Sequence, residues 1–133
     1  TSPSPRQHIA SLALVVPDYY AAIAFYAGRL GFDLVEDTPL GGGKRWVLVT
    51  AGEGGTPLLL AKAANEAQAA RIGDQTGGRV GFFLQTDDFW RDHARMSAAG
   101  VEFLESPREE SYATVAVFRD AYGNRWDLLQ PKG

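Results

Sequence analysis

LVVPDYYAAIAFYAGRLGF, residues 14–32, sets the architecture of the chain, because its pattern returns as LQTDDFWRDHARMSAAGV at residues 84–101. Each copy consists of an apolar strand end, an aspartate, an amphipathic segment and a glycine that leads into a second apolar segment. Asp18 and Asp88 are typical helix N-caps, and Gly31 and Gly100 are typical of the position just after a helix end. The repeat predicts a fold built by duplication of one strand–helix–strand unit.

Around the first copy we expect a complete β-α-β-β-β module over residues 8–64. Residues 9–16 are almost continuously apolar, which is typical of a strand covered on both faces. The following helix carries apolar side chains at helical spacing, at Tyr19, Ala22, Ile23, Tyr26 and Leu30. Apolar runs bounded by glycines then predict three more strands, at residues 32–36, 45–50 and 58–61.

The second copy predicts an equivalent module over residues 79–132. Its strands are expected at residues 80–85, 101–104, 114–118 and 125–130, and its helix follows Asp88. Residues 65–78 are the connector between the modules, with a short helix over residues 65–72, and residues 1–7 are expected to be a flexible tail.

The two modules together predict one α+β domain, residues 8–132. A single helix covers only one face of each sheet, so the other faces must curl toward each other or toward a partner chain. We therefore expect two βαβββ modules that form a cupped, mixed, mostly antiparallel sheet. Its concave side is the expected location of a small-molecule ligand.

The composition argues against several classes of function. The 133 residues, 45% of them hydrophobic, are enough to bury the core of one globular domain. The formal net charge of -3 argues against a nucleic-acid partner, because phosphate binding needs clustered Lys and Arg. The absence of cysteine removes disulfides, thiolate nucleophiles and Cys-ligated zinc. No apolar run approaches the roughly 20 residues of a membrane span, so we expect a cytoplasmic protein without a membrane partner.

Five segments of the chain carry a family resemblance. They are the Val16-Pro17-Asp18 turn and residues 22–26, 30–32, 98–103 and 118–128. Through these segments, residues 8–131 resemble the vicinal oxygen chelate superfamily, which includes glyoxalase I, fosfomycin resistance enzymes, extradiol dioxygenases and bleomycin resistance proteins. The resemblance implies the two-module cupped fold. It leaves the activity open, because this scaffold carries lyases, dioxygenases, transferases and proteins that only bind.

The resemblance also implies where a metal would bind. Metal-bearing relatives have a histidine in the first strand of a module, and here those positions are Ser11 and Gly81. The carboxylates expected in the last strands fall at about Leu59 and at Asp127. A catalytic metal generally needs about three protein ligands, and one aspartate does not meet that number. We therefore expect no bound metal and no other cofactor.

The two histidines do not replace the missing ligands. His8 stands three residues before Ser11, so the alternation of strand side chains points it away from the cavity. His93 lies on a helix with Phe89 and Met96, and this spacing indicates a histidine that stacks at the edge of the core.

Asp127 is the polar residue that the resemblance places in the cup. A carboxylate there either pairs with Arg125 or Arg45, binds a cationic ligand group, or becomes neutral. Aromatic side chains offer stacking surfaces, although alternation alone does not tell which face of residues 45–49 lines the cavity. Residues 105–110 form a charged loop, either solvated surface or the rim of the cavity. The candidate ligand-binding residues are Ser11, Arg45, Trp46, Gly81, Phe83, Tyr112, Arg125 and Asp127.

Three functions fit these observations. The one we favour is metal-free binding of a small, partly aromatic molecule, as in relatives that protect by sequestration. The second is a metal-dependent lyase or dioxygenase with an unconventional ligand set that includes Asp127 or His8. The third is a metal-free enzyme in which Asp127 moves a proton on a carbonyl substrate. In all three we expect a homodimer, because the strands present more apolar surface than two helices cover.

Overall fold

The computed structural model describes residues 6–133, so residues 1–5 of the expected tail lie outside the described part of the chain. The first module consists of β1 (Leu12–Val16), α1 (Tyr19–Ile23), the π-helical turn η1 (Ala24–Arg29), β2 (Asp33–Gly41), β3 (Lys44–Thr50) and β4 (Leu58–Lys62). After the short helix α2 (Glu66–Ala69), the second module consists of β5 (Val80–Gln85), α3 (Phe89–Ala98), β6 (Glu102–Phe103), β7 (Arg108–Glu109), β8 (Ala113–Arg119) and β9 (Arg125–Pro131). The βαβββ order of the first module returns in the second, where β7 is an additional short strand, and this repeat confirms the α+β fold class that the duplicated segment predicts.

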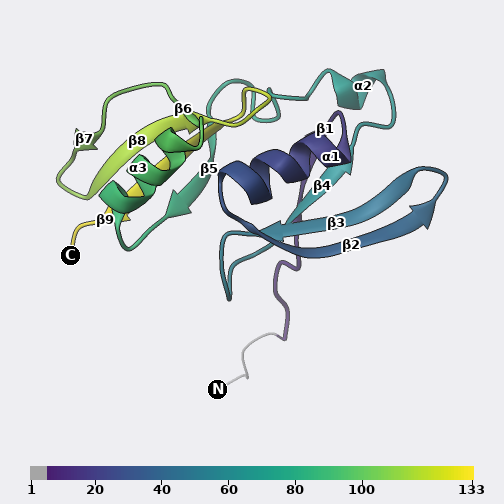
Figure 1. Ribbon diagram of the computed structural model, residues 1–133, viewed down its shortest axis with the longest axis horizontal. Coiled ribbons are helices and arrows are strands. Elements are labelled where there is room, and N and C mark those ends of the chain that lie inside the picture. The colour runs from purple at the N-terminus through teal and green to yellow at the C-terminus, as the bar shows by residue number, and fades with distance from the viewer. Residues whose placement is uncertain (1–5) are drawn as a thin grey trace.

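The strands form two sheets, one in each module (Figure 1). The strand order is β1-β4-β3-β2 in the first sheet and β5-β9-β8-β6 in the second, where β7 also pairs with β8. In each sheet the first strand is parallel to the last, β1 to β4 and β5 to β9, and the other pairs are antiparallel. The mixed, mostly antiparallel pairing is thus as expected, and within one chain it is divided between two sheets.

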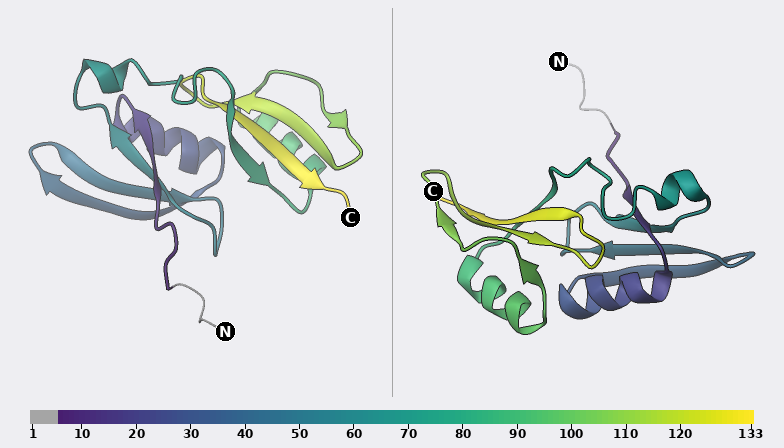
Figure 2. Two further views of the ribbon diagram at one scale, coloured as in Figure 1. Left: turned by 180° about the vertical axis from the view of Figure 1, so that it is seen from behind. Right: turned by 90° about the horizontal axis from the view of Figure 1, so that it is seen from above.

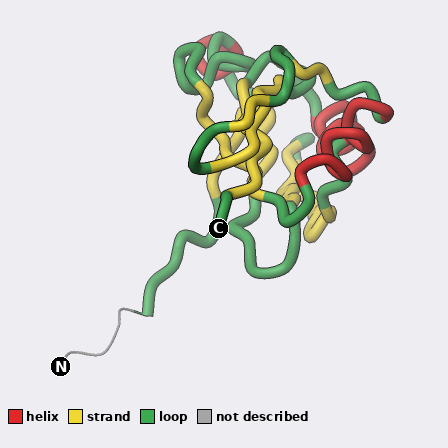
Figure 3. Tube along the Cα trace, turned by 90° about the vertical axis from the view of Figure 1, so that its left-hand side faces the viewer, coloured by secondary structure: helices red, strands yellow, loops and turns green. Residues whose placement is uncertain are grey.

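The helices of both modules lie on the same side of the two sheets. The right-hand view of Figure 2 shows the α1–η1 segment and α3 together below the strands. In Figure 3, seen from another direction, the longer helices lie to one side of most of the strands. Neither helix therefore covers the opposite face of its sheet, which we call the open face of each module.

One hydrophobic core fills the space between the helices and the sheets. Trp126 of β9 lies where the modules meet, because its ring is 5.9 Å from that of Tyr26 and 6.0 Å from that of Phe32. On the side of its own module, the same ring stacks on Phe82 at 4.7 Å. The core is therefore shared between the modules, so their relative position depends on side-chain packing as well as on the connector.

The helix ends agree with the sequence prediction. Asp18 accepts a hydrogen bond from the backbone N of Ala21 at 2.9 Å, and Asp88 accepts one from Arg91 at 3.1 Å. Gly31 and Gly100 follow the helices with φ values of 78° and 89°, a backbone conformation that glycine adopts at little cost.

Three elements differ from the prediction. β2 reaches Gly41 rather than ending at residue 36, and β6 is only two residues long. β7 lies inside the expected charged loop of residues 105–110, because this loop runs beside the free edge of β8 and pairs with Thr114 and Val115. Within residues 6–133, no helix is long and apolar enough to cross a membrane.

Candidate functional site

The open face of module one carries an aromatic and aliphatic surface. In β3, Val47 and Val49 are fully buried toward the helix, so the alternating residues Trp46 and Leu48 lie on the open face. Leu48 pairs with Leu59 of β4, which extends the apolar surface to the next strand. The structure thus settles which side of this strand faces away from the helix, and Trp46 is 38% exposed there.

A shallow cavity of about 230 Å³ lies over this surface. Its lining includes Trp46 and Leu59 from the sheet, Leu40 from the β2–β3 hairpin, and Gln68 from α2. Ligand cavities for drug-sized molecules usually measure about 300–1,000 Å³. One chain alone therefore offers a partial cavity on this face.

The open face of module two combines a carboxylate with apolar side chains. In β9, Trp126 and Leu128 are buried toward the helix, so Asp127 and Leu129 alternate onto the open face. Asp127 pairs with Val117 of β8 on one side and with Phe83 of β5 on the other. Phe83 is 59% exposed, so its ring is available beside the carboxylate.

Of the alternatives that the sequence left open for Asp127, the structure does not show the ion pair with Arg45 or Arg125. Arg45 instead pairs with Asp37 at 2.7 Å, on the first module. Within residues 6–133, Arg125 forms no ion pair with Asp127 and no protein donor reaches the buried Asp127 Oδ1. Burial raises the pKa of the Asp127 carboxyl, and this effect outweighs the opposing influence of the Arg108 guanidinium.

Arg108 and Glu105 make the rim of this face, a role that the sequence left open. Glu105 accepts a hydrogen bond from the backbone N of Val117 at 3.2 Å, so its side chain lies against β8. Arg108 binds Glu105 and Glu110, each at 2.9 Å. The charges of residues 105–110 allowed the sequence to identify a charged loop. The position of this loop beside Asp127 could not be predicted, because it depends on the pairing of β7 with β8.

Arg45 and Tyr112 lie apart from the Asp127 surface. The backbone N of Arg45 donates to the Tyr19 hydroxyl at 3.1 Å, and its guanidinium lies 5.9 Å from the centre of the Tyr20 ring. Tyr112 precedes β8 and is 64% exposed. Of the eight candidate residues, Phe83, Arg125 and Asp127 share the open face of module two with Gly81, while Trp46 lies on that of module one.

The positions that hold metal ligands in relatives do not fit a metal here. Ser11 immediately precedes β1 and offers a hydroxyl. At Gly81, an added Cβ would overlap Cγ2 of Thr76, whose hydroxyl is held by the carbonyl of Arg79 at 2.7 Å. The connector thus occupies the space that a histidine side chain would need at this position.

No alternative ligand set replaces these positions. His8 is exposed ahead of β1, and the His93 ring lies 5.6 Å from Phe89 and 4.2 Å from Phe103. His93 is therefore part of an aromatic cluster, as its helical spacing indicates. Across residues 6–133, no group of three or more His, Cys, Asp or Glu side chains is placed to hold a metal ion.

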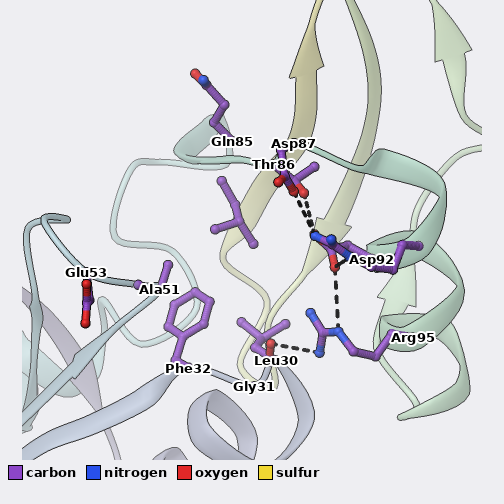
Figure 4. A pocket seen from close by; sticks show the side chains of 13 residues that line it. Leu30, Gly31, Phe32, Ala51, Glu53, Gln85, Thr86, Asp87, Asp92 and Arg95 are labelled. Carbon is purple, nitrogen blue, oxygen red and sulfur yellow. Dashed lines mark hydrogen bonds and ion pairs between the residues drawn. The ribbon is translucent and has the colours of Figure 1, made fainter.

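Two clefts separate the modules. An apolar cleft of about 450 Å³ is lined by residues of both modules, among them Leu12, Phe32, Leu58, Phe83 and Trp126. A polar cleft of about 590 Å³ lies between the end of η1 and the beginning of α3 (Figure 4).

The charged side chains that α3 and its preceding turn contribute to the polar cleft bind one another. Arg95 donates to the carbonyl of Leu30 at 3.1 Å and pairs with Asp92 at 3.7 Å (Figure 4). Arg91 pairs with Asp87 and Asp92, and Asp92 also accepts from the Thr86 hydroxyl. These contacts pair the charges of α3 and its preceding turn with one another and link α3 to the end of the first helix, so we assign them a structural role.

Comparison with known proteins agrees with this geometry. The sequence model of the Glyoxalase/Bleomycin resistance protein/Dioxygenase superfamily matches residues 8–128. The chain belongs to this superfamily. A protein of Shewanella frigidimarina whose role is uncharacterised is 54% identical over 127 residues, which cover 94% of each chain.

Two solved structures resemble the chain closely. UcmS2 has a TM-score of 0.80 at 28% identity, covering 94% of this chain and 98% of its own. TnmS3, an antibiotic binding protein from Streptomyces sp. CB03234, has a TM-score of 0.77 at 30% identity, covering 98% of this chain and all of its own. The likeness extends over both modules, so these two structures share the two-module architecture of this chain.

Proposed function

We propose that this member of the superfamily is a metal-free binding protein that holds a small, partly aromatic molecule against the open faces of its sheets. The observation that carries the proposal is the chemistry of those faces. Exposed Trp46 and Phe83 stand where a planar ring can stack, and each such contact contributes about 0.5–1.5 kcal/mol beyond burial. The positions used for metal in relatives instead hold Ser11, Leu59 and Gly81.

The likeness to TnmS3 supports a sequestration role. TnmS3 is an antibiotic binding protein, and its identity to this chain extends over nearly the whole sequence. A binding protein of this kind protects by holding a toxic molecule, which requires a cavity and affinity but no reactive group. The proposed role therefore matches a site with stacking surfaces, one carboxylate and no nucleophile–base pair.

We also propose that the site is completed by a second copy of the chain. The open faces of the two modules point to the same side of the molecule, so they do not face each other within one chain (Figures 2 and 3). The partial cavity on module one and the exposed Trp46 and Phe83 both call for a covering surface. A facing copy would supply it and would enclose the ligand between two sheets.

Calorimetric titration and thermal-shift screening test the binding role. Protein treated with a chelator is titrated with planar aromatic antibiotics and metabolites, and then again after addition of divalent metal ions. The proposal expects saturable binding that raises the melting temperature and does not depend on the chelator. Binding that disappears with chelator and returns with metal would contradict it.

A second candidate function rests on the raised pKa of Asp127. A carboxyl whose pKa is raised by burial is suited to general acid–base work on a carbonyl substrate. In that case Asp127→Asn would abolish turnover while ligand affinity survived. If carbonyl substrates that bind are released unchanged by the unsubstituted protein, this candidate is removed and the binding role stands.

A further inference from the structure

We infer that the bound molecule is an aromatic cation with a charged N–H at the edge of its ring system, and that Asp127 binds this N–H while the ring stacks on Phe83. The inference rests on the proposed function and names the chemical class of its ligand. It follows from the geometry and the charge of one row of residues on the open face of module two.

The first step is the distance between the two groups. Asp127 and Phe83 are Cα partners on the adjacent parallel strands β9 and β5, and neighbouring strands lie about 4.8 Å apart. Their side chains stand on the same face, so a ring stacked on Phe83 has its edge beside the carboxylate. A nitrogen attached directly to the ring, or one carbon removed from it, reaches the carboxylate from that position.

The second step is the unfilled hydrogen-bonding capacity of the carboxylate. Asp127 Oδ1 is buried, and no donor from residues 6–133 reaches it. Val117 flanks it on β8 and offers a side chain without a polar group. The second oxygen, Oδ2, is not among the enclosed atoms and accepts no hydrogen bond from residues 6–133, so a ligand reaches the carboxylate there. A ligand N–H satisfies this oxygen, and a charged donor forms the stronger, charge-assisted hydrogen bond.

The third step is the sign of the local charge. Arg108, whose charge influences the ionisation of Asp127, is held by Glu105 and Glu110. Arg125 stands two residues along β9 on the same face. Three carboxylates thus face two guanidinium groups, and the balance favours a cationic ligand over an anionic one. A positive charge near the exposed face of Phe83 gains a cation–π contribution as well.

Two fluorescent probes of similar shape test the inference. Proflavine is a planar tricyclic cation at neutral pH, and acridone is a neutral tricycle with the same ring frame. Each is titrated into the unsubstituted protein, into Asp127→Asn, and into Glu66→Gln. The last variant removes a negative charge from exposed helix α2 in the connector, so it controls for the loss of net charge alone.

The inference expects proflavine to bind roughly tenfold more tightly than acridone, as one charge-assisted hydrogen bond implies. Asp127→Asn should abolish this preference without changing the acridone affinity, which also verifies that the variant is folded. Glu66→Gln should keep the preference, and Asp127→Glu should keep most of it.

The two ways of failing are distinguishable. Acridone binding without any preference for proflavine, or a preference that survives Asp127→Asn, would overturn the inference and leave the binding role intact. If neither ring system gives a saturable signal with the unsubstituted protein, the proposed function is contradicted and the inference falls with it.

Discussion

At the scale of single residues, Asp127 and Gly81 show how far the sequence reaches. The resemblance placed Asp127 in the cup, and in the structure Trp126 and Leu128 are buried toward the helix, so Asp127 lies on the opposite face. That Asp127 has no arginine partner could not be predicted, because this depends on how the loop that contains β7 folds against β8. The contact between Gly81 and Thr76 could not be predicted either, because it joins a strand to a connector of irregular structure.

The raised pKa of Asp127 has a consequence for stability. Burial makes the charged form less favourable in the folded state, so the folded protein keeps the proton at pH values where the unfolded chain has lost it. Stability therefore falls as pH rises from the ordinary value of 3.8 through the raised folded pKa. Asp127→Asn should be more stable than the unsubstituted protein at neutral pH, by up to about 1 kcal/mol after allowance for partial exposure.

Urea denaturation at a series of pH values measures this effect. The advantage of Asp127→Asn should vanish below the ordinary pKa of aspartate, where both states carry the proton. A variant that is less stable than the unsubstituted protein at neutral pH would contradict the description of Asp127 as a carboxylate without a protein partner.

Gly81→Ala should destabilise the fold by about 1–3 kcal/mol, because the added Cβ would overlap Thr76 Cγ2. Thr76→Ser removes that methyl group and keeps the hydroxyl that donates to Arg79. The double variant should recover part of the loss, which a double-mutant cycle on thermal or urea unfolding detects. Strict additivity of the two single changes would show that Thr76 does not close the Gly81 position.

At the scale of the elements, the residues that begin and end each helix could be predicted from the sequence, but the internal form of the first helix could not. The chain is α-helical only to Ile23 and then widens, with the backbone N of Leu30 donating to the carbonyl of Phe25 at 2.9 Å. An α-helix has about 3.6 residues per turn, so it would turn Phe25 and Leu30 to different sides. The wider turn lets both side chains enter the core. A hydrophobic periodicity of 3.6 residues in the sequence does not predict this wider turn.

Tyr26 links this wider turn to the last hairpin. Its hydroxyl donates to Asp120 Oδ2 at 2.5 Å, and Asp120 Oδ1 accepts from the backbone N of Tyr122, Gly123 and Asn124. Tyr26→Phe removes one donor from a buried carboxylate and should cost about 1–3 kcal/mol of unfolding free energy in urea titration. A loss below a few tenths of a kcal/mol would contradict a stabilising link between the modules.

Alkaline pH tests the same contact independently. Burial, reinforced by the Asp120 charge, raises the pKa of Tyr26 well above its ordinary value of 10.0. The stabilisation is complete below pH 10 and is lost as pH rises above it, because only the unfolded chain then releases the phenolic proton readily. Tyr26→Phe should show a smaller loss of stability above pH 10. Equal pH dependence in both proteins would rule out this assignment.

At the scale of the whole molecule, duplication predicted the two βαβββ modules and their α+β class, and the position of one module against the other came only from the structure. That position depends on Trp126 at the module boundary and on the Arg95 contact with Leu30, which join residues far apart in the sequence. Because both open faces point to the same side, the proposed binding site requires a second copy.

Light scattering should therefore give a mass of twice 14.4 kDa. Trp46→Asp places a charge on the open face and should weaken the dimer by roughly tenfold or more, as loss of a central aromatic contact does. Trp90→Asp is the matched control, because Trp90 lies on α3 and is 57% exposed away from the open faces. Equal dimerisation of the two variants would argue against facing sheets.

The indole N–H signals of the three tryptophans test the central claim most directly. Trp46 lies on an open face, Trp126 is buried in the core, and Trp90 lies on the outside of α3. Chelator-treated, isotope-labelled protein is titrated with proflavine and followed by NMR. The proposed function predicts a saturable shift of the Trp46 indole and of β5 and β9 amides, with Trp90 unchanged. Shifts confined to Trp90, or shifts that appear only after a divalent metal is added, would contradict it.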